Sequence, residues 1–314
     1  MNKRNLKNTD IEIAPLLFGG NVFGWTIDEK RSHHLLDIFF EHGFNCIDTA
    51  DSYSTWKEGN KGGESEKIIG SWMKKNNNRN QVIIATKVGA KMPSGQKGLS
   101  KKYILSEAET SLKRLQTDYI DVYQSHYDDP ETPVEETLEA YQKLISEGKV
   151  RYIGASNFSA GRLEEAIKTD KGKKLPEYKT FQPKYNLYDR EFEKEYADVV
   201  KKYELSVITY YSVASGFLTG KYRSEKDFAK SARGHGMKKY MNKKGFAILE
   251  ILEELSKKYS CSYATISLAW LIQNPLVTAP IASATNETQL KELMQSTEII
   301  LDATDIDKLN NAER

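Results

Sequence analysis

Two patterns of hydrophobic and polar positions alternate along the chain of 314 residues. Short runs of apolar and β-branched residues, typical of strands buried on both faces, are each followed by a longer stretch with apolar residues at helical spacing. Eight such runs lie at residues 13–19, 44–48, 82–87, 119–126, 150–156, 178–182, 205–210 and 276–281. The repeated order of strand and helix predicts an α/β fold with a parallel sheet covered by helices.

The intervening stretches carry helix start and stop signals. Residues 29–41 hold a cluster of apolar side chains, and residues 100–115 open on Ser100, a residue type that caps helix N-termini. Pro133 is followed by two glutamates, so it marks the first turn of another helix. These signals support the assignment of helices between the strands.

Eight units of this kind favour closure into a (β/α)8 TIM barrel, one domain that covers residues 1–314. An open, doubly wound sheet is the alternative, but the turn GGNVFGW after the first run lacks the G-x-G-x-x-G fingerprint of that fold. Two additions are expected. Residues 1–12 form a hairpin that plugs the barrel, and residues 211–245 form an unusually long loop after the seventh strand.

Composition excludes several classes of protein. Hydrophobic residues make up 39% and charged residues 29%, with a mean hydropathy of −0.62, which disfavours a membrane or disordered protein. The net charge of +2 provides no general attraction to nucleic acid or anionic membranes. The first twenty residues lack a secretory signal pattern, and Cys46 and Cys261 are too few for a disulfide framework or a metal cluster. We therefore expect a cytoplasmic protein without a metal site.

Polar side chains end the predicted strands, where a barrel of this kind carries its chemistry. Asp48, Lys87 and His126 end three consecutive runs at intervals of 39 residues, about one strand-helix unit. An acid, an amine and an imidazole are thus expected to face one cavity. The later runs end at Ser156 with Asn157, at Gln182 and at Tyr210.

Tyr53 lies in the loop just after Asp48 and could face the same cavity. A lysine ammonium beside a phenol stabilises the phenolate, so we expect Lys87 to lower the pKa of Tyr53 toward neutrality and make it a usable general acid. Taken singly, Asp48 and Lys87 could be a structural ion pair, His126 a core histidine and Tyr53 a loop aromatic. All four at one end of a barrel favour a catalytic site.

Longer segments resemble the aldo-keto reductase superfamily over residues 13–300. They read FNCIDTADSYS (44–54), GESEKIIGSWMKK (63–75), VIIATKVG (82–89), FQPKYNLYDR (181–190) and FLTGKY (217–222), with the most specific match running from SLKRLQTDYIDVYQSH to GASNFS (111–159). The resemblance implies an NAD(P)H-dependent carbonyl reductase whose catalytic residues are Asp48, Tyr53, Lys87 and His126. Tyr53 then donates a proton to the carbonyl oxygen as hydride leaves the nicotinamide, Lys87 is held by Asp48, and His126 orients the carbonyl.

The resemblance also implies residues for the nicotinamide half of the cofactor. Ser156, Asn157 and Gln182 match residues that bind the carboxamide, and Tyr210 matches the aromatic on which the ring stacks. The next segment reads YYSVASGFLTGKY, which is similar to the pattern YSPLAxGLLTGKY of the family. The cofactor residues expected in this segment are Tyr211, Ser212, Gly216, Leu218 and Lys221, of which the first two depart from the usual Ser-Pro.

The adenosine half is implied by PIASATNETQLKEL (280–293), which is similar to PIPGARxxEQLxEN. Ser283, Gln289 and Glu292 fit this pattern, whereas Thr285 and Leu293 replace residues that often contact the nucleotide. The resemblance favours NADPH, and the missing positive charge at Thr285 leaves NADH as the alternative.

Residues 221–244 hold nine Lys or Arg against Glu225 and Asp227, a local charge of +7. Two interpretations compete, a loop that folds over the dinucleotide phosphates with a few of its charges and a solvated basic loop. A nucleic-acid patch is a remote third. The first is favoured.

The substrate is expected to be a small-molecule carbonyl compound that enters between aromatic side chains. Residues offered for this rim are Phe23, Trp25, Trp56 and Tyr127. They suit a flat or apolar aldehyde or ketone, and the glycine-rich residues 56–63 could act as a lid.

Two other functions remain open in the sequence. Lys87 could form a Schiff base in an aldolase, although the neighbouring Asp48 favours a permanent ammonium. The protein could also bind its cofactor mainly as a redox-responsive interaction subunit with little turnover, as in the channel-associated branch of the superfamily. Neither nucleic acid nor membrane is expected as a partner, and the sequence does not determine the oligomeric state.

Overall fold

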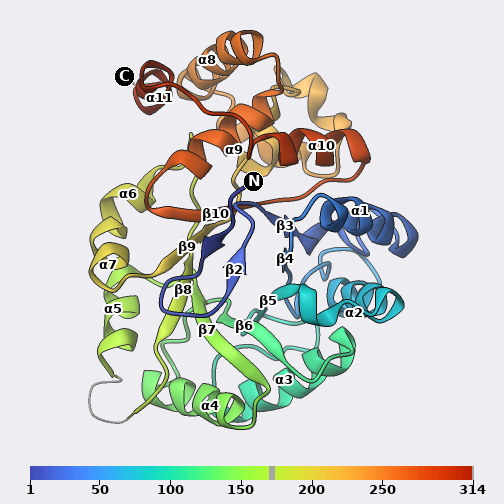
Figure 1. Ribbon diagram of the computed structural model, residues 1–314, viewed down its shortest axis with the longest axis vertical. Coiled ribbons are helices and arrows are strands. Elements are labelled where there is room, and N and C mark those ends of the chain that lie inside the picture. Colours follow the sequence, from blue (N-terminus) through green and yellow to red (C-terminus); the bar gives the residue numbers. More distant parts are fainter. Residues whose placement is uncertain (170–173, 313–314) are drawn as a thin grey trace.

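Eight parallel strands close into a barrel at the centre of the computed structural model, which describes residues 1–169 and 174–312. Their order around the barrel is β10, β3, β4, β5, β6, β7, β8, β9 (Figure 1). The strands are β3 (Leu17–Gly19), β4 (Cys46–Asp48), β5 (Ile83–Val88), β6 (Ile120–Ser125), β7 (Val150–Ser156), β8 (Tyr178–Gln182), β9 (Ser206–Thr209) and β10 (Val277–Ala282). The predicted (β/α)8 barrel is confirmed, and the alternative open sheet is wrong.

Helices surround this barrel, and the last of them in the chain lies beside the helix that follows the long loop (Figure 1). They are α1 (Glu29–Glu41), α2 (Glu64–Asn76), α3 (Lys101–Leu115), α4 (Val134–Ser146), α5 (Ala160–Thr169), α6 (Glu191–Glu195), α7 (Ala197–Lys202), α8 (Lys243–Tyr259), α9 (Tyr263–Gln273), α10 (Glu287–Gln295) and α11 (Ala303–Asn310). Ser100 caps α3 by accepting from the Tyr103 N–H, as its residue type predicts. Across the described residues, none of these helices has both the length and the apolar character needed to cross a bilayer.

The N-terminal hairpin closes one end of the barrel. It consists of β1 (Arg4–Asn5) and β2 (Glu12–Ile13), which pair antiparallel, and its Leu6, Ile11 and Ile13 side chains pack against inward-facing residues of the barrel strands. The predicted hairpin is thus confirmed, but the prediction that the first barrel strand begins at Ile13 is wrong. That strand begins only at Leu17, after Pro15, which lacks the N–H needed for sheet pairing.

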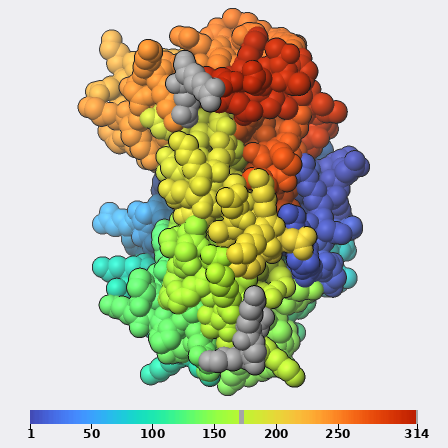
Figure 2. All heavy atoms as spheres, turned by 90° about the vertical axis from the view of Figure 1, so that its left-hand side faces the viewer, coloured from blue at the N-terminus to red at the C-terminus, as the bar shows by residue number. Residues whose placement is uncertain are grey.

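A side view places the hairpin and the long loop at opposite ends of the barrel. In Figure 2, which faces α5, α6 and α7, the N-terminal residues in dark blue lie at the right-hand edge. The light-orange residues that follow β9 in the chain project at the upper left. The end opposite the hairpin is the end at which the carboxyl termini of the strands meet.

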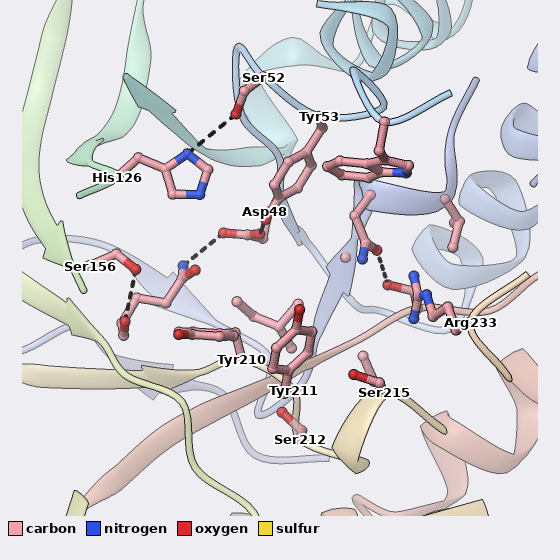
Figure 3. A pocket seen from close by; sticks show the side chains of 18 of the residues that line it. Asp48, Ser52, Tyr53, His126, Ser156, Tyr210, Tyr211, Ser212, Ser215 and Arg233 are labelled. Carbon is pink, nitrogen blue, oxygen red and sulfur yellow. Dashed lines mark hydrogen bonds between the residues drawn. The ribbon is translucent and has the colours of Figure 1, made fainter. Parts of the chain in front are cut away.

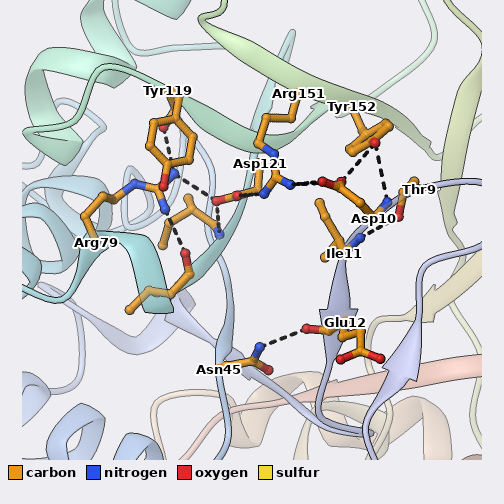
Figure 4. Close-up of polar contacts among 12 residues, drawn as sticks. Thr9, Asp10, Ile11, Glu12, Asn45, Arg79, Tyr119, Asp121, Arg151 and Tyr152 are labelled. Atoms are coloured by element: carbon orange, nitrogen blue, oxygen red, sulfur yellow. Dashed lines mark hydrogen bonds and ion pairs between the residues drawn. The ribbon is translucent and has the colours of Figure 1, made fainter.

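A buried carboxylate ties the hairpin to the barrel wall (Figure 4). Asp121 on β6 lies between Arg79, at 2.8 Å, and Arg151, at 2.7 Å, and it accepts the Ile84 N–H of β5. Arg151 also binds Asp10 in the hairpin loop at 2.9 Å. Two cations and a backbone donor thus compensate one buried charge.

Replacement of Asp121 by Ala is expected to lower the free energy of unfolding by about 3–5 kcal/mol, because two arginines and a backbone N–H lose their shared acceptor. Urea denaturation measures this loss. Asp118→Ala removes an exposed carboxylate from the adjoining loop and is the matched control, with an expected change below about 0.5 kcal/mol. Equal effects of the two substitutions would contradict the role of Asp121.

The long loop after β9 is more ordered than its sequence indicates. It folds into three short 3-10 segments, η3 (Ala214–Thr219), η4 (Glu225–Lys230) and η5 (Gly234–Tyr240), and α8 already begins at Lys243. A capping box formed by Ser224 and Asp227 starts η4. We call residues 221–242, between η3 and α8, the strap.

Candidate active site

A cavity of about 1270 Å³ opens at the carboxyl ends of the barrel strands (Figure 3). This volume exceeds the ~300–1,000 Å³ of a typical small-molecule site, so it can hold a dinucleotide together with a small substrate. Sixteen of the predicted site residues line it: Asp48, Tyr53, Trp56, His126, Tyr127, Ser156, Asn157, Gln182, Tyr210, Tyr211, Ser212, Gly216, Lys221, Ser283, Gln289 and Glu292. The strand-end positions predict six of them, namely Asp48, His126, Ser156, Asn157, Gln182 and Tyr210, and the others come from the following loops or from the family resemblance.

Lys87 lies beneath the cavity. It connects two other predicted catalytic residues, Asp48 on β4 and Tyr53 in the loop that follows β4. Its Nζ donates to Asp48 Oδ2, to the Thr49 carbonyl and to Tyr53 Oη, each at 2.8 Å. These bonds use all three protons of an ammonium group. Tyr53 Oη in turn donates to Asp48 Oδ2 at 2.9 Å. Because Lys87 is fully buried, only Tyr53 and Asp48 present this network to the cavity.

The pKa of Tyr53 shifts in the direction opposite to the predicted one. Burial and the Asp48 carboxylate raise the pKa of Tyr53 well above its ordinary value, because a phenolate would be both desolvated and beside a second anion. The sequence could not show that the hydroxyl bonds Asp48 as well as Lys87. Tyr53 therefore holds its proton at neutral pH, the state that a proton donor requires.

His126 is neutral at the same pH. Burial, assisted by the Lys87 charge, moves the pKa of His126 well below its ordinary value. Its Nδ1 is 3.5 Å from Ser52 Oγ, and its ring lies 6.1 Å from that of Tyr53 (Figure 3). With Nδ1 as acceptor, Nε2 carries the proton and can donate to a substrate oxygen.

The floor of the cavity is a hydrogen-bonded set of side chains. Gln182 Nε2 donates to Asp48 Oδ1 at 2.8 Å, and Tyr210 Oη donates to Asn157 Oδ1 at 2.6 Å. Ser156 Oγ donates to the Gln182 carbonyl at 2.9 Å. These contacts fix amides and hydroxyls that suit a carboxamide, with the Tyr210 ring beside them.

Three of the nine cations counted in residues 221–244 face the cavity, namely Lys221, Lys230 and Arg233. Arg233 packs over the Trp25 ring, with its Cζ 5.1 Å from the ring centre. Its buried Nη2 has no hydrogen-bond partner in the described protein, and burial lowers the pKa of Arg233. A buried guanidinium of this kind is suited to an anionic ligand.

The opposite side of the cavity is polar but lacks a basic residue in the loop before α10. Ser283 Oγ donates to Asn21 Oδ1 at 2.6 Å, and Gln289 Oε1 accepts from the Thr285 N–H at 2.9 Å and from its hydroxyl at 3.0 Å. Glu292 places a carboxylate on the same wall.

Besides the buried Lys87, three predicted site residues do not line the cavity. Phe23 is fully buried and stacks on Phe18 at 5.2 Å, so it is a core residue rather than part of the substrate rim. The Leu218 side chain is fully buried too, inside η3. Trp25 does not line the cavity but contacts two residues that do. Arg233 packs over the Trp25 ring, and the centres of the Trp25 and Trp56 rings are 5.5 Å apart.

Sequence reasoning missed several lining residues. Asn21 lies two residues after the end of β3, so the rule that found the other strand-end residues could have found it. Lys230 and Arg233 are two of the nine cations in residues 221–244, and the sequence does not distinguish them from the other seven. Three further lining residues lie in loops without a distinguishing pattern, namely Ser52, Lys91 and Lys97.

Comparison with known proteins decides the family. The model of the Aldo/keto reductase family matches residues 15–314. The chain belongs to this family. It is 33% identical to the aldo-keto reductase YhdN of Bacillus subtilis, covering 99% of this chain and 93% of the relative.

Two further relatives carry different names. The uncharacterized oxidoreductase YrpG of Bacillus subtilis is 33% identical, over 98% of this chain and 94% of its own. A probable voltage-gated potassium channel subunit beta of Arabidopsis thaliana is 31% identical, over 96% and 92%. Family membership makes the chain an oxidoreductase of the kind that uses NADH or NADPH on small carbonyl compounds.

Proposed function

We propose that this chain reduces an aldehyde or ketone to the alcohol, and catalyses the reverse oxidation, with Tyr53 as the proton donor and NADPH as the cofactor. One observation carries the proposal. The protonated Tyr53 hydroxyl stands at the cavity edge between the Lys87 ammonium and the Asp48 carboxylate. This is a general acid held by a cation, beside a neutral imidazole.

The steps at the carbonyl follow from these groups. A bound nicotinamide supplies the hydride. His126 Nε2–H orients the carbonyl oxygen by a hydrogen bond, and Tyr53 transfers its proton to that oxygen as negative charge develops there. Lys87 stabilises the resulting phenolate, and Asp48 fixes the ammonium in place. In the reverse direction the phenolate accepts the alcohol proton.

The residues present fit a nicotinamide dinucleotide. Gln182, Ser156 and Asn157 would hold the carboxamide, and Tyr210 would support the ring. The unpartnered Nη2 of Arg233, together with Lys221 and Lys230, suits the phosphates. Ser283, Gln289 and Glu292 would line the adenosine end.

The initial rate of cofactor oxidation by the purified protein tests the proposal, with 4-nitrobenzaldehyde as substrate and NADPH, then NADH, as cofactor. Saturable turnover supports the reductase. The competing function is the alternative left open by the sequence, a cofactor-binding interaction subunit with little turnover, and a relative named as a probable potassium channel subunit beta keeps it in view. Tight cofactor binding without turnover over a broad carbonyl panel would favour that function.

Arg233→Met is expected to raise the Kd for NADPH by roughly tenfold or more, because a charge-assisted bond to phosphate is lost. Fluorescence titration measures Kd. Lys226→Met removes an equal charge from an exposed position of the strap that does not line the cavity, so its Kd should stay within about twofold of wild type. Equal changes in both variants would show only a general effect of charge.

The preference for NADPH over NADH is expected to be small, because the loop before α10 offers no cation for the 2′-phosphate. Thr285→Arg should raise the ratio of kcat/KM for NADPH to that for NADH by about tenfold. Steady-state kinetics with both cofactors give this ratio. An unchanged ratio would show that Thr285 is not near the 2′ position.

A further inference from the structure

Tyr211 is an aromatic residue in a backbone conformation that disfavours it. Its φ of 54° lies in the left-handed region, which glycine and asparagine adopt most easily and a bulky residue seldom does. A bulky aromatic side chain is thus held at a position where the backbone favours a smaller residue.

The turn around Tyr211 is held by contacts that do not involve its ring. The Tyr211 carbonyl accepts the Ala214 N–H at 2.6 Å and Asn186 Nδ2 at 3.0 Å. Ser212 Oγ donates to the Thr209 carbonyl at 3.0 Å. Because the backbone is fixed on both sides, the direction in which the ring leaves the chain is fixed as well.

The ring stands inside the cavity with much of its surface uncovered. Figure 3 shows it between Tyr210 and Arg233, and its centre is 5.1 Å from that of Tyr210. Tyr211 is 46% exposed, and Trp56 and Tyr127 are each 50% exposed. Of the five exposed large hydrophobic residues in the described chain, these three line one cavity. Uncovered aromatic surface gathered in this way indicates a ligand with an apolar face.

The three rings come from three loops that surround the catalytic groups. Trp56 follows β4, and its ring is 6.0 Å from that of Tyr53. Tyr127 follows β6 and stacks on His126 at 4.8 Å. Tyr211 follows β9. It lies near enough to Tyr53 and to Tyr127 to contribute to the raised pKa of each of these two phenols. The approach to the reacting carbonyl is thus bordered by aromatic faces.

We propose that Tyr211 is a specificity-determining residue whose ring, with those of Trp56 and Tyr127, forms a wall for a flat aromatic carbonyl substrate. The inference rests on the proposed carbonyl reduction and adds the substrate class. It also gives the Tyr211 side chain a substrate contact in place of the cofactor contact expected from the sequence. Stacking on such a ring covers the surface that the free protein leaves exposed.

Tyr211→Asn and Tyr211→Phe test the proposal with 4-nitrobenzaldehyde and with butanal. Asparagine tolerates the left-handed backbone, so this variant should fold with an unchanged or higher Tm. We expect it to raise KM for 4-nitrobenzaldehyde about five- to tenfold, the size of one ring contact, while KM for butanal and Kd for NADPH stay within about twofold. Phenylalanine keeps the ring and should retain the wild-type KM for both aldehydes.

An equal rise in KM for both aldehydes, or a rise in Kd for NADPH as large as that in KM, would overturn the proposal. Failure of the proposed reduction is distinguished by calorimetric titration of the NADPH-saturated protein with 4-nitrobenzamide, a flat carbonyl that is not reduced. Weaker binding to Tyr211→Asn than to wild type supports the aromatic wall even if no aldehyde turns over. Equal binding to both contradicts it.

Discussion

Tyr53→Phe is expected to lower kcat for carbonyl reduction by about 10³-fold, because the substitution removes the only hydroxyl that Lys87 and Asp48 hold at the cavity edge. Kd for NADPH should change less than about twofold. The phenylalanine ring can keep the position of the tyrosine ring, 4.5 Å from Lys87 Nζ and 6.0 Å from the Trp56 ring. Steady-state rates and fluorescence titration on the same preparation measure both quantities.

Tyr127→Phe is the matched control for this loss. It removes a phenol from the same cavity without touching the Lys87 network, and kcat should stay within about threefold of wild type. A Tyr53→Phe enzyme with most of its turnover would contradict the role of Tyr53. Similar losses in both variants would indicate that the cavity tolerates no change.

Lys87→Met is expected to abolish measurable turnover and to lower the free energy of unfolding by about 3–5 kcal/mol. The cation is fully buried, and its removal leaves the Asp48 carboxylate desolvated, with only Tyr53 and Gln182 as donors. Activity assays and urea denaturation measure the two losses.

A double variant separates catalysis from structure at this ion pair. Asp48→Asn combined with Lys87→Met removes both charges and should recover most of the lost stability while staying inactive. The structural ion pair considered from the sequence makes the opposite prediction, since activity would return with stability. Recovery of turnover in the double variant would therefore contradict a catalytic role for Lys87.

The barrel strands and the polar residues at their ends could be predicted from the sequence, because burial determines the residue types there. The barrel strands are buried on both faces, so they appear as apolar runs, and an acid or imidazole at the end of such a run, as at Asp48 and His126, is conspicuous. The prediction for Ile13 is wrong because residues 13–19 were treated as one strand, whereas Pro15 interrupts pairing within them and Ile13 pairs with Arg4 in the hairpin.

Hydrogen-bond partners and contacts between side chains could not be predicted from the sequence in the same way. The direction of the Tyr53 pKa shift depends on which oxygen its hydroxyl faces, and residue spacing does not specify a hydrogen-bond partner. The contact between Arg233 and Trp25 joins distant parts of the chain, so nothing local distinguishes Arg233 from its eight basic neighbours. Phe23 lies in the loop after a barrel strand, as expected for a residue of the substrate rim. Its ring nevertheless stacks on Phe18 and is buried in the core.

The most direct test of carbonyl reduction at this site is the isotopic content of the product. Purified protein is supplied with NADPH deuterated at both positions of nicotinamide C4 and with 4-nitrobenzaldehyde, and the alcohol is analysed by mass spectrometry. We predict an alcohol with one deuterium on the former carbonyl carbon, formed by the wild type at an initial rate about 10³-fold above that of Tyr53→Phe. Absence of labelled alcohol from a wild-type protein that demonstrably binds the cofactor would contradict the account.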